Sequence, residues 1–192
     1  MPVLSAQTIS YLCRNRKMVD PFTAEKIVVR GKSYGLSAAT YDVRIAHDLI
    51  LQPDPMKALQ RVTVNNRLWS TQNILDHWIT TMKDGANHAL AHTEEDFHMP
   101  DNICGVVMDK STYARQFMSA MNTFIDPGFQ GNLTLELVNH GPDPISLNSG
   151  DPIAQILFLE LDQATNHPYD GKYQHQTKAA HPARYEDPAA TG

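Results

Sequence analysis

From residue 100 onward, turn-forming residues divide the sequence into short apolar runs. The clearest interruptions are Pro127-Gly128, Gly141-Pro142-Asp143-Pro144 and Ser149-Gly150-Asp151-Pro152. Glycine and proline in these combinations stop a helix and favour tight turns. Strands at this spacing are typical of an antiparallel sandwich or barrel and argue against alternating strand–helix units. We therefore expect a mainly β fold.

Before residue 100 the sequence indicates two short helices and one strand. Ser5 is a suitable N-cap for the first helix, whose apolar residues fall on one face: Ile9, Leu12 and Cys13. Residues 18–22 end this helix, with Pro21 as the breaker. Residues 43–51 are typical of a strand. A second helix is expected from Ser70, because apolar residues recur there at helical spacing: Ile74, Trp78, Ile79 and Met82.

The bulk composition is that of one globular domain. The chain has 192 residues, of which 42% are hydrophobic and 19% charged. Its net charge of −5 argues against a protein that coats nucleic acid, although a few cations suffice to hold a phosphorylated ligand. Cys13 and Cys104 are too few for a disulfide scaffold. With no leader-like start and no stretch of about 20 apolar residues, we expect a cytoplasmic protein without a membrane partner.

Residues 133–139 alternate leucine with other side chains. In a strand, the three leucines share one face, and Glu136 points to the opposite face between Thr134 and Val138. One interpretation is a carboxylate on the solvent side of a half-buried sheet. The other is a carboxylate aimed into a cleft, where it acts as an acid–base group. Alternation alone does not decide between them.

Basic and hydroxyl side chains follow the apolar run 103–108, namely Lys110, Ser111, Thr112 and Arg115. If this segment is helical, Ser111 and Arg115 lie one turn apart on the same face. Two hydroxyls and two cations near a helix start suit phosphate binding. Similar clusters also occur on ordinary surfaces, and Thr112 suits a helix cap.

The segment His92-Thr93-Glu94 matches half of the zinc nucleoside deaminase signature. That chemistry also needs two thiolates from a P-C-x-x-C motif. Here Cys104 follows Pro100 at the wrong spacing, and no second cysteine comes after it. We therefore reject a catalytic zinc and interpret the histidines as surface or packing residues.

Several segments in consistent order resemble motifs of the dCTP deaminase family, which belongs to the dUTPase-like superfamily. They are residues 110–115 (KSTYAR), 125–129 (IDPGF), 134–137 (TLEL), 150–155 (GDPIAQ) and a PY…KYQxQ tail at 168–176. Residues 33–37 (SYGLS) and 41–44 (YDVR) are similar to the N-terminal motif of one bacterial subgroup. The chain is identified as a divergent member of this family, and a viral source is compatible with its departures.

The resemblance implies a distorted β-barrel or jelly roll of the dUTPase-like type with a few short helices. It implies one domain over residues 1–192, with 162–192 as a C-terminal tail or lid, and a homotrimer whose active sites are shared between subunits. The implied activity is metal-independent hydrolytic deamination of dCTP to dUTP and ammonia, supplying dUTP for thymidine nucleotide synthesis. Mg²⁺ would accompany the triphosphate without a protein ligand, and inhibition by dTTP stays open.

The resemblance also assigns roles to individual residues. Glu136 matches the catalytic glutamate that shuttles a proton, Ser111 would orient the water, and Arg115 would support Glu136 and the substrate. The expected substrate contacts are Lys110 and Thr112 to phosphates, Asp126 to the 3′-hydroxyl, Phe129 beneath the sugar, and Gln155, Tyr169, Lys172 and Gln176 over the triphosphate. A purely structural role is the alternative for Phe129, and a disordered tail is the alternative for Tyr169 and Lys172.

Some segments depart from the family pattern. Residues 52–89 resemble no motif, and residues 121–124 differ from the usual residues beside the base pocket. Asn122 and Phe124 would change which base is accepted, so a modified deoxycytidine nucleotide is one candidate substrate.

Two rival functions remain. The first is a dUTPase or a bifunctional deaminase and diphosphatase, in which Asp126 also orients a water toward phosphorus. Two residues argue against a plain dUTPase. Phe129 stands where dUTPases usually have a tyrosine that stacks on the base, and Glu136 has no required role in dUTP cleavage. The second is a regulatory protein that binds nucleotides without catalysis. Against it stands the presence of all four expected site residues, because a protein without catalysis usually loses such residues: Lys110, Ser111, Arg115 and Glu136.

Overall fold

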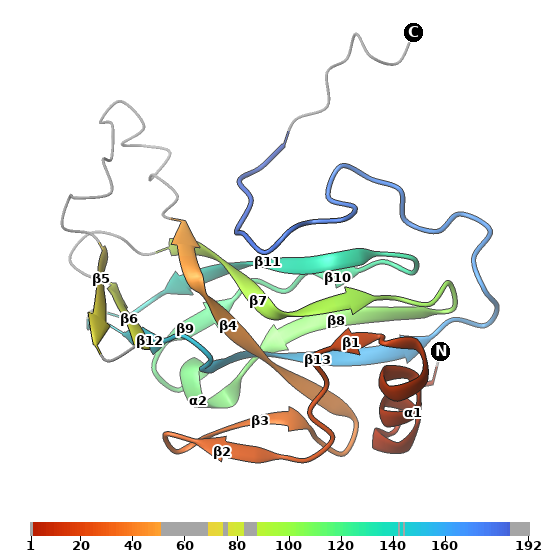
Figure 1. Cartoon of the computed structure of the whole chain (residues 1–192), viewed down its shortest axis with the longest axis horizontal. Helices are drawn as coiled ribbons and strands as arrows, with labels where there is room; N and C mark the ends of the chain where they lie inside the picture. Colours follow the sequence, from red (N-terminus) through yellow and green to blue (C-terminus); the bar gives the residue numbers. More distant parts are fainter. Residues whose placement is uncertain are drawn as a thin grey trace, which may run out of the picture.

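The computed structural model describes residues 2–50, 69–74, 77–82, 88–141, 143 and 145–184. Within these residues the chain is mainly β, as the turn spacing predicted (Figure 1). The helices are α1 (Ala6–Arg16) and α2 (Ser111–Ala114). The strands are β1 (Val19–Asp20), β2 (Ile27–Val29), β3 (Lys32–Leu36), β4 (Thr40–Ile50), β5 (Trp69–Ile74), β6 (His77–Met82), β7 (His88–His98), β8 (Ile103–Asp109), β9 (Met118–Ala120), β10 (Phe124–Ile125), β11 (Gln130–Asn139), β12 (Ser146–Asn148) and β13 (Pro152–Glu160).

Most of these strands form one curled antiparallel sheet. Its main path runs β10-β8-β13-β4-β7-β11-β9, and ten of the described strands belong to it. The long strand β4 joins the two halves, because Thr40–Arg44 pair with β13 while Ile45 and residues 49–50 pair with β7. A register shift between Ile45 and Leu49 accompanies this change of partner. The sheet therefore bends into a half-barrel, as the expected distorted barrel requires (Figure 1).

The core fills the inside of this curl. Strand alternation sends Leu133, Leu135 and Leu137 of β11 inward, where each is at most 5% exposed. They pack in one cluster with aromatic residues of other strands and of α2, including Tyr41, Phe97, Tyr113 and Phe158. The residues between the leucines are half-buried on the opposite face of β11. The core leucines and the pair Thr134 and Glu136 therefore lie on opposite faces of this strand.

The expected first helix is present as α1. Ser5 caps it by accepting a hydrogen bond from the amide of Thr8, and Ile9, Leu12 and Cys13 are buried. The helix ends at Arg16, where Lys17 adopts a left-handed conformation, so it stops before Pro21 is reached.

Both cysteines are buried free thiols. No helix of the described chain is long and apolar enough to span a bilayer.

The expected second helix from Ser70 is wrong. Residues 69–74 and 77–82 are strands β5 and β6, which pair antiparallel from Trp69–Met82 to Ile74–His77. Strand β12 adds to β6 and completes a small second sheet. The segment is rich in β-branched residues, such as Thr71, Thr80 and Thr81, and strand pairing outweighs the helical spacing of its apolar residues.

Asp151, which directly precedes β13, connects three other parts of the fold. Its fully buried carboxylate accepts hydrogen bonds from Arg30 at 2.8 and 3.2 Å and from Lys32 at 2.7 Å, both in the β2–β3 hairpin. The Tyr113 hydroxyl of α2 donates at 3.0 Å, and Asn148 of β12 donates twice at 3.1 Å. Burial alone would raise the pKa of Asp151, but the hydrogen bonds from Lys32, Arg30 and Asn148 outweigh it and lower the pKa to about 2.

Substitution of Asp151 tests this connection. Asp151→Asn leaves two cations and a hydroxyl without their charged acceptor, so the free energy of unfolding should fall by about 2–3 kcal/mol in urea titrations at pH 7. Because the pKa of Asp151 is depressed from 3.8 to about 2, its stabilisation is complete above pH 4. The difference between wild type and variant should shrink as the pH falls from about 4 to 2.

The matched control is Asp20→Asn. Asp20 accepts from Lys17 at 3.4 Å on the surface, with side chains 49% and 72% exposed, so its loss should cost under about 0.5 kcal/mol. Equal effects of the two substitutions would contradict the special role of Asp151.

Candidate active site

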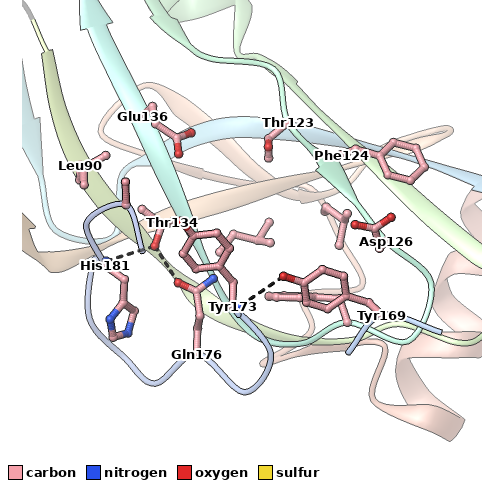
Figure 2. A pocket seen from close by; sticks show the side chains of 14 residues that line it. Leu90, Thr123, Phe124, Asp126, Thr134, Glu136, Tyr169, Tyr173, Gln176 and His181 are labelled. Atoms are coloured by element: carbon pink, nitrogen blue, oxygen red, sulfur yellow. Dashed lines mark hydrogen bonds between the residues drawn. The ribbon is translucent and has the colours of Figure 1, made fainter. Parts of the chain in front are cut away.

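A pocket of about 280 Å³ opens on the face of β11 that points away from the core. It lies between β11, the segment 123–129 and the returning C-terminal tail, which we define as residues 162–184 (Figure 2). Its volume is near the lower end of the ~300–1,000 Å³ typical of small-molecule sites. The lining residues are Leu90, Thr123, Phe124, Ile125, Asp126, Phe129, Leu133, Thr134, Glu136, Tyr169, Tyr173, Gln176, His181 and Ala183.

Glu136 is the carboxylate that β11 presents to this pocket. The strand is paired on both sides, with β7 where Glu136 lies opposite Leu90 and with β9 where Leu137 lies opposite Ala120. The backbone position of Glu136 is therefore fixed. Glu136 is half-buried, and burial raises the pKa of its carboxyl, opposed by a hydrogen bond from its own backbone. The cleft interpretation of this residue therefore fits its position, and a raised pKa suits a group that must both accept and release a proton.

Asp126 and Phe129 reach the pocket from a tight turn. Gly128 adopts a φ of +83°, and the Phe129 amide donates to the Asp126 carbonyl at 3.2 Å. Phe129 is only 6% exposed and belongs to the core, and it also lines the pocket edge-on to Tyr169, with ring centroids 5.8 Å apart. Phe129 therefore packs in the core and also contributes to the wall of the pocket.

The tail folds back along β11 and forms one wall of the pocket. The amide of Tyr169 donates to Pro127, and the amide of His175 donates to Gln130, both at 2.8 Å. Further along, the Thr134 hydroxyl donates a hydrogen bond to the side-chain oxygen of Gln176 at 3.1 Å. The same hydroxyl accepts a hydrogen bond from the amide of His181 at 3.3 Å. Tyr173 and Gln176 lie over the pocket in Figure 2. The tail therefore docks on the strand that carries Glu136.

A second group of predicted residues lies outside the pocket. Lys110 is the N-cap residue of α2, and its ammonium is buried against Asp42 at 2.7 Å. Gln155 donates to the other oxygen of Asp42 at 3.2 Å. Ser111 and Arg115 start and follow the single turn of α2, and both are exposed. In Figure 1, α2 lies on the opposite side of the sheet from the tail.

The predicted residues thus separate into two groups. The pocket brings together Asp126, Phe129, Glu136, Tyr169 and Gln176, while Lys110, Ser111, Thr112, Arg115 and Gln155 lie at or near α2, and Lys172 is exposed in the tail. Thr112 lies inside α2 and is not its cap. None of the described lining residues is a lysine or arginine, so the pocket of one chain offers carboxylates without the cations that a triphosphate needs.

Sequence reasoning missed several lining residues. Thr134 was detectable because it shares the face of Glu136. Phe124 lines the pocket, whereas Asn122 is not among the described lining residues. Leu90, Tyr173 and His181 carried no strong signal, since their positions depend on how β7 and the tail pack against β11. Among the described residues, no group of three or more histidine, cysteine or acidic side chains is arranged to hold a metal.

Comparison with a solved structure shows the fold class. The 2′-deoxycytidine 5′-triphosphate deaminase from Agrobacterium tumefaciens superposes with a TM-score of 0.54 at 16% identity, over 81% of this chain. The matched part is 46% of that longer chain, so this chain spans less than half of its length. At this identity the likeness shows that the two proteins share one mainly β fold.

Sequence comparison then gives the family. The family model described as dCTP deaminase-like matches residues 3–161. The dCTP deaminase of Campylobacter jejuni is 34% identical over 173 residues, covering 88% of this chain and 91% of that protein. The dCTP deaminase of Campylobacter concisus is 32% identical over 180 residues, covering 92% and 95%. The chain therefore belongs to the dCTP deaminase-like family.

Gly131 permits the tail to approach β11, and its substitution tests the lid. A Cβ at Gly131, whose φ is +125°, would lie 2.6 Å from the Gln176 nitrogen and 2.7 Å from its carbonyl oxygen. Gly131→Ala should therefore displace the tail, and trypsin should cut at Lys172 and Lys178 about tenfold faster than in wild type.

Gly31→Ala is the control for backbone strain. Gly31 also has a positive φ, +74°, but a Cβ there would meet nothing within 4 Å. Unchanged cleavage in Gly131→Ala, or equal acceleration in both variants, would show that the tail does not depend on this contact.

Proposed function

We propose that this protein catalyses the hydrolytic deamination of dCTP to dUTP and ammonia. The observation that carries the proposal is Glu136, a half-buried carboxylate with a raised pKa in a pocket under the C-terminal lid. The relatives that match most of the chain are named dCTP deaminases, which supports the same substrate.

Glu136 acts as the proton carrier. Its ionised carboxylate takes a proton from a water molecule as the oxygen attacks C4 of the cytosine. The C–O bond forms, and the protonated Glu136 gives this first proton to N3 of the ring. Glu136 then takes the second proton from the new hydroxyl group at C4 and gives it to the amino nitrogen. The C–N bond breaks, ammonia leaves, and the carbonyl of uracil remains. Because the carboxyl is returned to its ionised state, one residue serves both steps.

The other pocket residues position the nucleoside. Asp126 accepts a hydrogen bond from the 3′-hydroxyl, and Phe129 packs beneath the sugar, with Tyr169 at its edge. Gln176 and Tyr169 belong to the lid, which closes the pocket against bulk water during the reaction.

The triphosphate is held by residues of α2 from a second copy of the chain. The described lining of the pocket contains no lysine or arginine, while Ser111 at the start of α2 and Arg115 just after it are exposed. A homotrimer in which each pocket receives Ser111 and Arg115 from its neighbour supplies the missing charge. Ser111 then orients the water and Arg115 supports Glu136, while Lys110, Thr112, Gln155 and Lys172 complete the substrate contacts.

Mg²⁺ enters with the triphosphate. The ion takes its ligands from phosphate oxygens and water, as Mg²⁺ commonly does in sites that bind nucleoside triphosphates. Bound there, it neutralises phosphate charge.

A bifunctional enzyme that also cleaves dUTP is the second candidate. It is favoured by the presence of a second carboxylate, Asp126, in the same pocket, where it can orient a water toward phosphorus. Phe124, which lines the pocket and is 54% exposed, favours a pyrimidine with an added substituent as a further substrate.

Incubation with dCTP and Mg²⁺, followed by chromatography, separates these functions. The proposal predicts dUTP as the product, whereas dUMP and pyrophosphate would show the bifunctional enzyme. If dUTP is cleaved while dCTP stays intact, the protein is a dUTPase.

Glu136→Gln tests the proton carrier directly. The amide keeps the shape of the side chain but cannot take a proton, so kcat should fall by at least about 10³-fold while dCTP still binds. In wild type, turnover should fall as the pH drops below the raised pKa of Glu136, because the protonated form cannot activate water. Glu160→Gln is the control, since Glu160 lies on β13 outside the pocket and accepts from Asn102. Full activity of Glu136→Gln would point instead to a binding protein or another catalytic group.

Mixing two inactive variants tests the shared site. Glu136→Gln and Arg115→Ala should each be inactive alone, but a pocket with Glu136 from one subunit and Arg115 from the next is intact. After joint refolding in equal amounts, about one quarter of the wild-type activity should return, as random assembly of a cyclic trimer requires. No recovery would indicate that each site is built within one chain.

A further inference from the structure

Arg184 connects the end of the described tail to residues about twelve positions earlier. Its backbone amide donates to the hydroxyl of Tyr173 at 3.0 Å, and its guanidinium donates to the carbonyl of Lys172 at 2.9 Å. A second guanidinium nitrogen lies 3.1 Å from Nδ1 of His181, and a guanidinium can only donate, so Nδ1 accepts. The guanidinium carbon is also 6.0 Å from the centroid of the Tyr173 ring, within the range of a cation–π contact. One residue therefore closes residues 172–184 into a loop.

Tyr173 is the residue through which this loop meets the pocket. Tyr173 and Ala183 both line the pocket, and Arg184 directly follows Ala183. The amide of Tyr173 donates to the hydroxyl of Tyr169 at 3.2 Å, which fixes the main chain on that side (Figure 2). The ring and the hydroxyl of Tyr173 are both in contact with Arg184. Arg184 therefore restricts where this part of the pocket wall stands.

Lys172 is the cation whose placement depends on the same contacts. Its ammonium lies 5.4 Å from the centroid of the Tyr173 ring, and its carbonyl accepts from Arg184. Lys172 is exposed, so its charge is open to a ligand. Since the described pocket lining contains no lysine or arginine, the placement of this nearby cation matters for an anionic substrate.

The rest of the tail is docked by contacts that do not involve Arg184. The amide of His175 donates to Gln130 at 2.8 Å, and Thr134 bonds to the side chain of Gln176 and to the amide of His181. Removal of the Arg184 side chain leaves these contacts in place. The contribution of Arg184 is therefore local to the loop.

We propose that Arg184 is a positioning residue, which holds Tyr173 and Lys172 in the arrangement that receives the nucleotide. This inference rests on the proposed function, which places the substrate in this pocket. Arg184 acts through its two neighbours and not by touching the substrate. Without its side chain the loop occupies several arrangements, and only a fraction of the molecules is ready to bind. The apparent affinity falls by that fraction, whereas the saturated enzyme is unchanged.

Steady-state kinetics with dCTP test this role. Arg184→Ala should raise KM by about tenfold and leave kcat within about twofold of wild type, because the loss precedes binding. Arg184→Lys keeps the charge but replaces the planar fork by one ammonium, which cannot bridge Lys172 and His181, so it should resemble Arg184→Ala. Lys178→Ala is the control, since it removes another exposed cation from the same loop and should change KM by less than about twofold.

Trypsin cleavage after Lys172 in the ligand-free protein gives a readout that needs no turnover. Mass spectrometry should show this cut about fivefold faster in Arg184→Ala and in Arg184→Lys than in wild type, because the loop is no longer closed. The rate in Lys178→Ala should match wild type. The melting temperatures should be equal, because the core contacts are intact.

Each other result has a definite meaning. Unchanged KM and unchanged cleavage in Arg184→Ala overturn the inference. Full recovery in Arg184→Lys also overturns it, because charge alone would then suffice and Arg184 would belong to the phosphate contacts. A lower melting temperature and a lower kcat with unchanged KM would assign Arg184 a purely structural role.

The two readouts also separate this inference from the proposed function. If cleavage at Lys172 depends on Arg184 but wild type does not deaminate dCTP, the proposed function fails and the closed loop stands. If wild type deaminates dCTP with a KM that does not depend on Arg184, the proposed function stands and the inference fails.

Discussion

The two-sided character of β11 is the constraint on which the site depends. Leu133, Leu135 and Leu137 anchor one face in the core, and this burial fixes the register of the strand. A shift by one residue would expose the leucines and bury Glu136, so the packing energy of the core also orients the carboxylate. The pairing of β11 with β7 and β9 removes the remaining freedom. The tail then docks on the same strand through hydrogen bonds to Thr134, next to Glu136 along the outward face.

Buried ion pairs and hydrogen bonds hold α2 and its flanking residues in place. Lys110 is paired with Asp42, and Tyr113 of α2 is tied to the Asp151 cluster, so the short helix that presents Ser111 and Arg115 is held from both ends of its turn. A second buried pair, Arg44 with Glu95 at 2.7 Å, joins β4 to β7 where the sheet bends. Such pairs contribute little net stability compared with apolar packing, but removing one partner is costly, and they favour one arrangement over others. The fold thus keeps Arg115 and the carboxylate of Glu136 on separate surfaces of one chain.

Much of the fold and part of the site could be predicted from local sequence. Period-two leucines identified β11, turn residues marked the strand ends after residue 100, and Ser5 marked the start of α1, because these signals act within a few residues. The helix expected from Ser70 failed because apolar spacing alone does not separate a helix from a hairpin whose partner strand, β12, lies more than sixty residues away. His181 and Leu90 could not be found, because their place in the pocket depends on tail docking and strand pairing over long distances. The trimer stays a prediction.

The central claim is that water attacks the base at C4 under the control of Glu136. The most direct measurement is a reaction with dCTP in ¹⁸O-labelled water, followed by mass spectrometry of the base and of the phosphates. The account predicts one heavy oxygen in the uracil base of the product and none in the base recovered from Glu136→Gln. A base that stays unlabelled while heavy oxygen enters the phosphates would contradict it, because the water would then attack phosphorus.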